Sequence, residues 1–228
     1  MMTYNIGHFN YGVGVGLPSS IYAEKLNNYK NFLESCGCSI IGIQEYATYI
    51  DEAQTISSDT ALFDLNYPKN GGQTNLWCAL KSKYRFYNKE SGSFGNRPYV
   101  AATMNVNGNP VYFLCVHLSP GAANASARVT EAQQIIQKVS NKTRYVIFGD
   151  FNPEPGEEDS LFSLFASENM NLANCGNFGK IVTYHNDPRY IIDNIITSSN
   201  ITIENAYSLD VYSLLSSDHL PLIAQLRF

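Results

Sequence analysis

The chain has 228 residues, of which 44% are hydrophobic and 15% are charged, and its formal net charge is −5. This length and apolar content allow a buried core without metal or disulfide support, and they exclude a disordered or fibrous protein. No apolar run approaches the roughly 18 residues of a membrane span, so we expect no stable membrane insertion. An acidic chain is a poor candidate for binding duplex nucleic acid through bulk electrostatics, although a local basic groove or a bound cation would overcome this.

The cysteines and the first residues bear on the compartment. The five cysteines are odd in number and mostly lie in apolar stretches, so we expect reduced, mostly buried thiols. Cys36 and Cys38 lack the second Cys or His cluster that a zinc site needs. The chain starts with a strand-like segment and shows neither the basic head nor the apolar stretch of a signal peptide. The protein is therefore expected to be cytoplasmic, or secreted if an upstream leader was removed, and the sequence does not choose.

In the first half of the chain, apolar spacing predicts strands at both ends of a helix. The helix covers residues 19–35, where Tyr22, Leu26, Tyr29 and Leu33 share one face. Residues 47–75 are polar and weakly patterned, and we expect a helix followed by a long loop there. The strands predicted in this half cover residues 1–6, 39–45 and 76–80.

In the second half, the turn sequence Asn107-Gly108-Asn109 predicts a hairpin between two apolar strands. A buried strand follows at 145–148, and Tyr207–Leu215 is interpreted as a further buried strand, or alternatively as an exposed apolar loop suited to a lipid. The other predicted strands cover residues 99–106, 111–118, 191–197 and 220–228, and the predicted helices cover 126–139 and 159–168.

Helices and strands alternate here, but several strands meet directly in hairpins, so a purely parallel sheet is not expected. The pattern instead favours an α/β (α+β) protein with two mixed sheets packed face to face and helices outside. No repeat, linker or low-complexity tract interrupts the chain, so we expect one domain over residues 1–228, acting as a monomer.

Polar residues recur where apolar strands end. Strand ends at one edge of a sheet converge in space, and binding sites are built on the loops there. Taken in chain order, these residues are Asn5, Glu45, His117, Asp150, Asn152, Asp193, Asp218 and His219.

These residue types suit one kind of chemistry. Carboxylate and amide oxygens are hard ligands for Mg²⁺, Mn²⁺ or Ca²⁺. Two histidines can act as acid and base near neutral pH, and an Asp beside an imidazole holds its tautomer. No Ser or Cys has the sequence context of a nucleophile. Water is then the expected nucleophile and a phosphate ester the expected substrate.

Six short motifs occur in an order that resembles the endonuclease/exonuclease/phosphatase superfamily, which has the deoxyribonuclease-I-like fold. Each motif is weak alone, but the ordered set spans residues 3 to 221. Arg128 and Glu131, on the predicted helix before Gly149, and Thr183, before Asp193, also match residues that are typical of this family. The motifs are Thr3-Tyr4-Asn5-Ile6, Ile43-Gln44-Glu45, Val116-His117-Leu118, Gly149-Asp150-Phe151-Asn152, Ile192-Asp193-Asn194-Ile195 and Ser217-Asp218-His219-Leu220-Pro221.

The resemblance implies a four-layer α/β/β/α sandwich and a role for each motif residue. Glu45 would bind a divalent cation, usually Mg²⁺ and alternatively Mn²⁺, with Asn5 nearby and Asp218 as a possible further contact. The remaining residues would act on the substrate. Asp150 would position or deprotonate the attacking water, Asn152 would hold a phosphate oxygen, His219 oriented by Asp193 would bond the phosphate or act as base, and His117 would stabilise the transition state or protonate the leaving group.

The sequence leaves the substrate open. The family acts on nucleic acids and on small phosphoesters, and fold does not settle function. Arg97 stands where members often carry a phosphate-contacting arginine. The basic residues Lys81, Lys83, Arg85 and Lys89 form a loose cluster that we interpret as a solvated face. The expected function is a metal-dependent phosphoesterase, with a phosphatase acting on phospholipid, sphingomyelin or inositol phosphate as the alternative and a non-catalytic binding module as the third possibility.

Overall fold

The computed structural model describes residues 1–7, 19–46, 77–215 and 217–228 of the chain. Two sheets face each other. The five-stranded sheet has the order β10-β11-β1-β2-β3 and the six-stranded sheet the order β4-β5-β6-β7-β9-β8. The strands are β1 (Met2–Asn5), β2 (Ile40–Tyr46), β3 (Trp77–Ser82), β4 (Tyr87–Phe94), β5 (Arg97–Val106), β6 (Asn109–His117), β7 (Tyr145–Asp150), β8 (Asn171–Leu172), β9 (Asp193–Thr197), β10 (Thr202–Ser208) and β11 (Leu222–Arg227).

Both sheets are mixed, as the sequence predicts. β1 pairs with β2 in parallel and with β11 antiparallel. In the other sheet, β6 pairs with β7 in parallel and with β5 antiparallel. The β5–β6 hairpin turns through Asn107 and Gly108, whose φ angles are 53° and 80°, and Val106 pairs with Asn109. Two positive φ angles in a two-residue loop define the type of hairpin turn that Asn-Gly favours.

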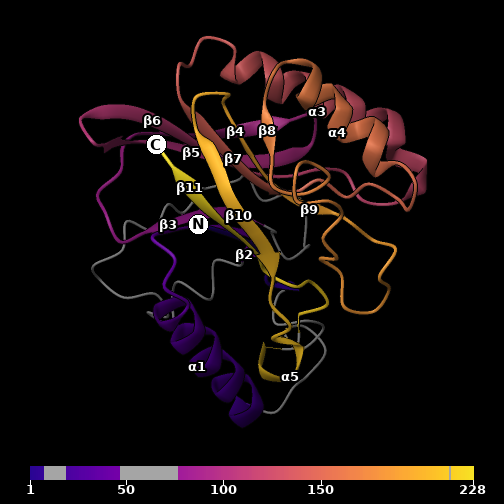
Figure 1. Ribbon diagram of the computed structural model, residues 1–228. Coiled ribbons are helices and arrows are strands. Elements are labelled where there is room, and N and C mark those ends of the chain that lie inside the picture. Colours follow the sequence, from indigo (N-terminus) through magenta and orange to yellow (C-terminus); the bar gives the residue numbers. More distant parts are fainter. Residues whose placement is uncertain (8–18, 47–76, 216) are drawn as a thin grey trace.

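Helices cover the outer faces of the two sheets (Figure 1). Helices α3 (Ala125–Val139) and α4 (Glu158–Ser167) pack on the six-stranded sheet through a core that includes Ile135, Phe162 and Ile147. On the other side of the sandwich, α1 (Ser19–Ser35) packs on the five-stranded sheet, where the Phe32 ring meets the Tyr4 ring edge-on at 6.1 Å. The result is the α/β/β/α order of layers.

The two sheets approach closely at Gly42 of β2. A Cβ atom at this position would lie 2.5 Å from the Phe148 Cβ and 3.3 Å from the Cys115 Sγ, both in the facing sheet. Such contacts are far shorter than van der Waals distances, so only glycine fits without movement of a strand. This contact fixes β2 against β6 and β7, the strands that carry three of the predicted site residues.

Two sequence interpretations are wrong. The segment expected to be a buried strand before Asp218 is instead the end of β10 followed by the short helix α5 (Tyr212–Leu215), with Tyr212 and Leu214 exposed. In the loose basic cluster, Lys81 is buried rather than solvated, because it stands within β3 and is paired there with Ile41 of β2. The strands β4, β8 and β10 were not predicted, and the polar segment 47–75 lies outside the described residues.

Helices in the described part of the chain all fall short of the length and apolar character that crossing a bilayer requires. The five cysteines are free thiols, with Cys38, Cys78 and Cys115 buried.

Candidate active site

The strand register brings the predicted polar residues to one edge of the sandwich. His117 and Asp150 are paired at the ends of the parallel strands β6 and β7, and Asp150 is paired on its other side with Asp193 at the start of β9. In the facing sheet, Asn5 ends β1 next to β2, which carries Glu45. Strand ends that are adjacent by pairing explain why residues so distant in sequence meet here.

Asp150 lies at the centre of the site and is buried. One carboxylate oxygen, Oδ2, lies 3.0 Å from Asn5 Nδ2, 3.3 Å from His117 Nε2 and 3.6 Å from His219 Nε2. The other oxygen, Oδ1, accepts a hydrogen bond of 2.9 Å from the backbone N–H of Asn152. Three side chains therefore converge on a single carboxylate oxygen, and one of them comes from the opposite sheet.

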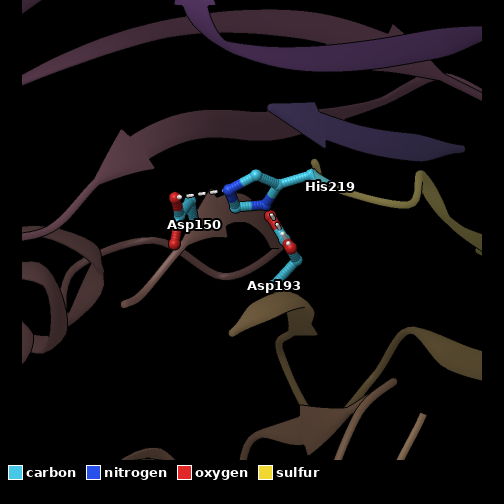
Figure 2. Close-up of side chains that lie close together, drawn as sticks. All are labelled: Asp150, Asp193 and His219. Atoms are coloured by element: carbon cyan, nitrogen blue, oxygen red, sulfur yellow. Dashed lines mark hydrogen bonds and ion pairs between the residues drawn. The ribbon is translucent and has the colours of Figure 1, made fainter. Parts of the chain in front are cut away.

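His219 is held between two carboxylates (Figure 2). Its Nδ1 lies 2.9 Å from Asp193 Oδ2, and its Nε2 faces Asp150 and lines a cavity. This is the contact that the sequence predicts for the Asp193–His219 pair. Because the Nδ1 atom is occupied by Asp193, the ring presents only Nε2 to the cavity, which fixes the direction of any proton transfer.

Burial and charge shift the acidity of both central groups. Burial raises the pKa of the Asp150 carboxyl to about 7, against the opposing effect of a charged His219. Burial alone would lower the pKa of the His219 imidazole, but the negative charges of Asp193 and Asp150 outweigh it and raise that pKa to about 10. At neutral pH the imidazole therefore carries a proton, stabilised by the carboxylates on either side.

Glu45 projects into the same cavity from an irregular strand. Its φ angle is 56°, unusual for a residue with a side chain, and the β2–β3 register shifts between Ile43 and Tyr46. An irregularity of this kind re-aims a side chain, and positive φ angles on residues other than glycine concentrate at functional sites. Asn152, whose φ is 50°, has the same feature.

The amide nitrogen of Asn5 donates hydrogen bonds to the carboxylates of Glu45 and Asp150, and its amide oxygen is bonded to a different group. Its Oδ1 accepts a hydrogen bond of 2.9 Å from the Gly7 backbone N–H. Its Nδ2 donates to Glu45 Oε1 at 3.3 Å and to Asp150 Oδ2 at 3.0 Å. In this arrangement Asn5 connects Glu45 and Asp150 through hydrogen bonds from one amide nitrogen.

The cavity has a volume of about 460 Å³ and contains most of the predicted site residues. Asp218 lines it from the loop before β11, and Arg97 lines it while its Nε donates to the His117 carbonyl at 2.9 Å. Asn152 lines it too, with its Nδ2 bonded to the Leu118 carbonyl at 3.0 Å. Asn5 and Asp193 stand behind the lining and contact it through Asp150 and His219.

Two loops that form one wall of the cavity are tied down by Arg128, which is fully buried in α3. Its guanidinium donates to the carbonyls of Ser119 and Gly121 at 2.8 and 2.9 Å and forms a two-point pair with the Glu157 carboxylate at 3.0 and 2.5 Å. Glu131 accepts two further hydrogen bonds from Ser119. Arg128 and Glu131, which the sequence resemblance singles out, thus hold the loops beside Asn152 in place.

Sequence reasoning missed four residues that line the outer part of the cavity. Tyr184, Tyr190, Glu154 and Asp187 all contribute to its wall. They lie in irregular segments without apolar periodicity, and only the fold brings them to the site. The sequence signals were the position of Glu154 just after Asn152 and that of the other three residues between Thr183 and Asp193. Thr183 Oγ1 accepts the backbone N–H of Asp193 at 3.1 Å and so ties this segment to β9.

The donor set of the cavity fits a hard divalent cation. Carboxylates of Glu45 and Asp218 line the same space, and burial raises the pKa of the Glu45 carboxyl, so a cation bound there would stabilise its ionised form. The buried cluster of Asp150, Asp193 and His219 is also close enough to surround an ion. There, however, Asp193 Oδ2 and His219 Nδ1 already bond to each other, so this cluster is better explained as a charged triad.

Comparison with known proteins agrees with this geometry. A sequence model of the exonuclease/endonuclease/phosphatase type, described as "Endonuclease-reverse transcriptase", matches residues 111–223. That segment contains His117, Asp150, Asn152, Asp193 and His219. No curated protein matches the sequence significantly.

Solved structures with the same fold align with the whole chain. An endonuclease/exonuclease/phosphatase from Bacteroides vulgatus is 18% identical, with a TM-score of 0.78 over 100% of this chain and 97% of that one. The human Nocturnin catalytic domain with a bound sulfate anion is 22% identical, with a TM-score of 0.77 over 100% and 93%. TDP2 from D. rerio complexed with a single-strand DNA product is 14% identical, with a TM-score of 0.75 over 100% and 98%.

These findings confirm the resemblance that the ordered motifs predict. The chain carries the sequence pattern of the endonuclease/exonuclease/phosphatase family over residues 111–223 and has the family's deoxyribonuclease-I-like fold. At the level of the family, this supports a phosphoesterase or nuclease.

Proposed function

We propose that the protein is a metal-dependent hydrolase that cleaves a phosphoester by attack of a water molecule in the cavity beside Asp150. The observation that carries the proposal is the convergence of Asn5, His117 and His219 on one oxygen of the buried Asp150 carboxylate. Such an arrangement has little structural purpose of its own, because burying two histidines and two carboxylates together costs free energy that an apolar core would not.

The residues divide the reaction between them. Asp150, with its pKa raised toward neutrality, accepts the proton of the attacking water as the water oxygen bonds to phosphorus. Protonated His219 donates from Nε2 to a phosphoryl oxygen, and we assign the second amide hydrogen of Asn152 as a further donor to this group. His117, on the other side of Asp150, donates a proton to the alcohol oxygen as its bond to phosphorus breaks.

Glu45 and Asp218 are the residues that would hold the cation, with Asn5 keeping the Glu45 carboxylate in place. A bound Mg²⁺ or Mn²⁺ would supply Lewis-acid polarisation of the phosphoryl oxygen. Arg97 adds a fixed positive charge at the cavity wall and is proposed as a weaker phosphate contact.

The test is a panel of phosphoesters assayed with Mg²⁺ and after exhaustive chelation: plasmid DNA, RNA, inositol phosphates, sphingomyelin vesicles and bis(4-nitrophenyl) phosphate. We expect hydrolysis of at least one ester, lost on chelation and lost in Asp150→Asn. Asp159→Asn is the matched control, since Asp159 is an exposed carboxylate that pairs with Lys180 outside the cavity. Full activity in Asp150→Asn or in the chelated protein would refute the proposed mechanism.

A further inference from the structure

The outer part of the cavity holds features that the proposed reaction does not use. Tyr184 and Tyr190 form an aromatic wall, with ring centroids 5.3 Å apart. Beside them lie two carboxylates, Glu154 and Asp187. We call these four residues the aromatic-acidic rim. Since the rim borders the groups proposed to bind the phosphate, it would contact whatever the phosphate is attached to.

The aromatic wall is rigidly attached to the proposed catalytic histidine. The Tyr184 ring meets the His219 ring edge-on at 5.8 Å, and the backbones of these two residues form a β-bridge. The Tyr190 hydroxyl donates to Glu154 Oε2 at 3.2 Å, and its backbone N–H donates to the Asp187 carbonyl at 3.1 Å. Both rings are therefore held at a set distance from the phosphate position, as a preformed subsite requires.

Acidic side chains outnumber cationic ones in the cavity lining, even with His219 protonated. Five of its lining residues are acidic, namely Glu45, Asp150, Glu154, Asp187 and Asp218. Among the described lining residues, Arg97 alone is a lysine or arginine. Sites that bind clustered phosphates use several Lys or Arg side chains, because each phosphate needs charge-assisted donors.

Nearby basic residues are committed to other partners. The Arg128 guanidinium is buried against Glu157, and the exposed Arg189 side chain pairs with Asp187 at 2.6 Å. Lys180 pairs with Glu158 and Asp159.

The sequence outside the described residues cannot reverse this balance. Residues 8–18 contain no Lys or Arg, and residues 47–76 contain Lys69 as their single basic residue. The latter segment also contains the acids Asp51, Glu52, Asp59 and Asp64. A bound divalent cation would compensate two of the inner carboxylates, and Arg189 compensates Asp187, which leaves the charge of Glu154 at the rim.

From this balance we infer that the site selects an ester that brings one phosphate group attached to a planar or aromatic group, and that it discriminates against clustered phosphates. The inner residues bind the single phosphate, and the Tyr190 ring stacks on the attached group while the Tyr184 ring, inclined to it by 51°, contacts the same group at its edge. The Glu154 carboxylate repels any second or third phosphate. This inference rests on the proposed function and narrows it to a substrate class.

The selectivity is tested by binding as well as by turnover. Phenyl phosphate and inositol 1,4,5-trisphosphate are titrated separately into the Mg²⁺-loaded protein and followed by NMR, and both bis(4-nitrophenyl) phosphate and the trisphosphate are assayed for hydrolysis. We expect phenyl phosphate to bind at least about tenfold more tightly, because stacking on an aromatic side chain contributes about 1–3 kcal/mol and 1.4 kcal/mol is tenfold. Equal or tighter binding of the trisphosphate, or binding of neither compound, overturns the inference.

Two variants assign the selectivity to the rim. Tyr190→Ala should raise KM for the aryl diester on the order of tenfold with a smaller change in kcat, and Tyr190→Phe, which keeps the ring, should recover most of the affinity. Glu154→Lys should tighten binding of the trisphosphate. Tyr84→Ala, which removes an exposed tyrosine that does not line the cavity, is the matched control. An unchanged KM in Tyr190→Ala refutes the stacking role.

Failure of the inference and failure of the proposed function give different results. If no ester of the larger panel is hydrolysed, the proposed function fails, while the binding titrations still decide the selectivity. If the trisphosphate is the better substrate, the proposed phosphoesterase function is supported and the inferred role of the aromatic-acidic rim is wrong.

Discussion

A buried carboxylate is costly unless it has a partner, and Asp193 shows how the site meets this cost. It stands in the buried strand β9, and His219 supplies a hydrogen bond of 2.9 Å and a positive charge. Asp193 Oδ1 is nevertheless buried without a hydrogen-bond partner among the described residues. A fold under selection for stability alone would not keep such a group, so the pair is best explained by the orientation that it imposes on the imidazole.

Asp193→Asn tests this orientation. The amide is nearly isosteric with the carboxylate, so the fold should persist and the melting temperature should change little. Turnover should fall on the order of 10³- to 10⁴-fold, as it does when a histidine loses the aspartate that fixes its tautomer. The measurement is kcat on a verified substrate together with thermal unfolding. A variant that turns over at the wild-type rate would remove Asp193 from the mechanism.

At the scale of elements, the buried Arg128 of α3 connects the helix layer to the loops of the site. Its charge is balanced by Glu157, whose side chain is 17% exposed. Burial acts to raise the pKa of the Glu157 carboxyl, but the hydrogen bonds from Arg128 outweigh it and lower that pKa below the usual 4.5. A carboxyl with a lowered folded-state pKa contributes stability that is complete above about pH 4.5 and is lost as the pH falls through the folded-state value.

Glu157→Gln should therefore destabilise the protein at neutral pH and flatten its response to acid. Leaving the buried guanidinium without a counter-charge costs about 3 kcal/mol. Urea unfolding at pH 7 and at pH 4 measures both effects. Glu204→Gln is the matched control, because Glu204 pairs with the exposed Arg227 and a surface pair of this kind contributes less than about 1 kcal/mol. Equal losses of unfolding free energy in the two variants would show that the buried Arg128–Glu157 pair stabilises the fold no more than the exposed Arg227–Glu204 pair does.

The contact between sheets at Gly42 supports a second prediction at this scale. Gly42→Ala places a methyl group 2.5 Å from the Phe148 Cβ, so β2 or β7 must move. Overpacking of this kind costs about 1–3 kcal/mol. Because the same strands carry Glu45 and Asp150, activity should fall as well. Thermal unfolding measures the loss of stability, and a phosphoester assay measures the loss of activity. An unchanged melting temperature in Gly42→Ala would show that the two sheets accommodate the methyl group without strain.

How far the sequence predicts the elements depends on where each element obtains its stability. The hairpin at Asn107-Gly108 is predicted because its turn chemistry is local. The strands β4 and β10 are edge strands whose residues are mostly exposed, so neither shows apolar alternation. Their pairing with β5 and β11 holds them in place, and this information is not local in sequence. α5 was mistaken for a strand because a short apolar run does not by itself distinguish a strand from a helix.

The site residues also fall into two groups, those that local sequence predicts and those that only the tertiary fold brings to the cavity. His117 and Asp150 are predicted because they end apolar strands, and His219 because it precedes one, and strand ends mark the edge of a sheet. Tyr184 and Tyr190 are not, because they stand in an irregular segment and reach the cavity only through the tertiary fold. The sequence also does not predict that the Asn5 oxygen is occupied by the Gly7 N–H, since this follows from how the chain turns after β1.

At the scale of the whole molecule, an acidic protein gathers several of its carboxylates around one cavity, and this concentration should make its stability depend on cations. Repulsion between the lining carboxylates opposes folding, and an ion bound at Glu45 and Asp218 would relieve it. Mg²⁺ at about 100 times its dissociation constant should add about 2.7 kcal/mol to the free energy of unfolding. For a chain of this size, this corresponds to a rise in melting temperature of roughly 5–10 °C.

Glu45→Gln should reduce this rise to a small fraction, because a neutral amide is a poorer ligand for a hard cation, while Asp159→Asn, which removes a carboxylate outside the cavity, should keep the full rise. Scanning fluorimetry of the three proteins, each with Mg²⁺, with chelator and with K⁺ at matched ionic strength, separates specific binding from general screening of charge. Because this readout needs no substrate, it tests the metal site independently of the reaction. If Mg²⁺ raises the melting temperature equally in wild type and Glu45→Gln, or if K⁺ produces the same rise, the cation does not bind at Glu45 and the proposed metal site is wrong.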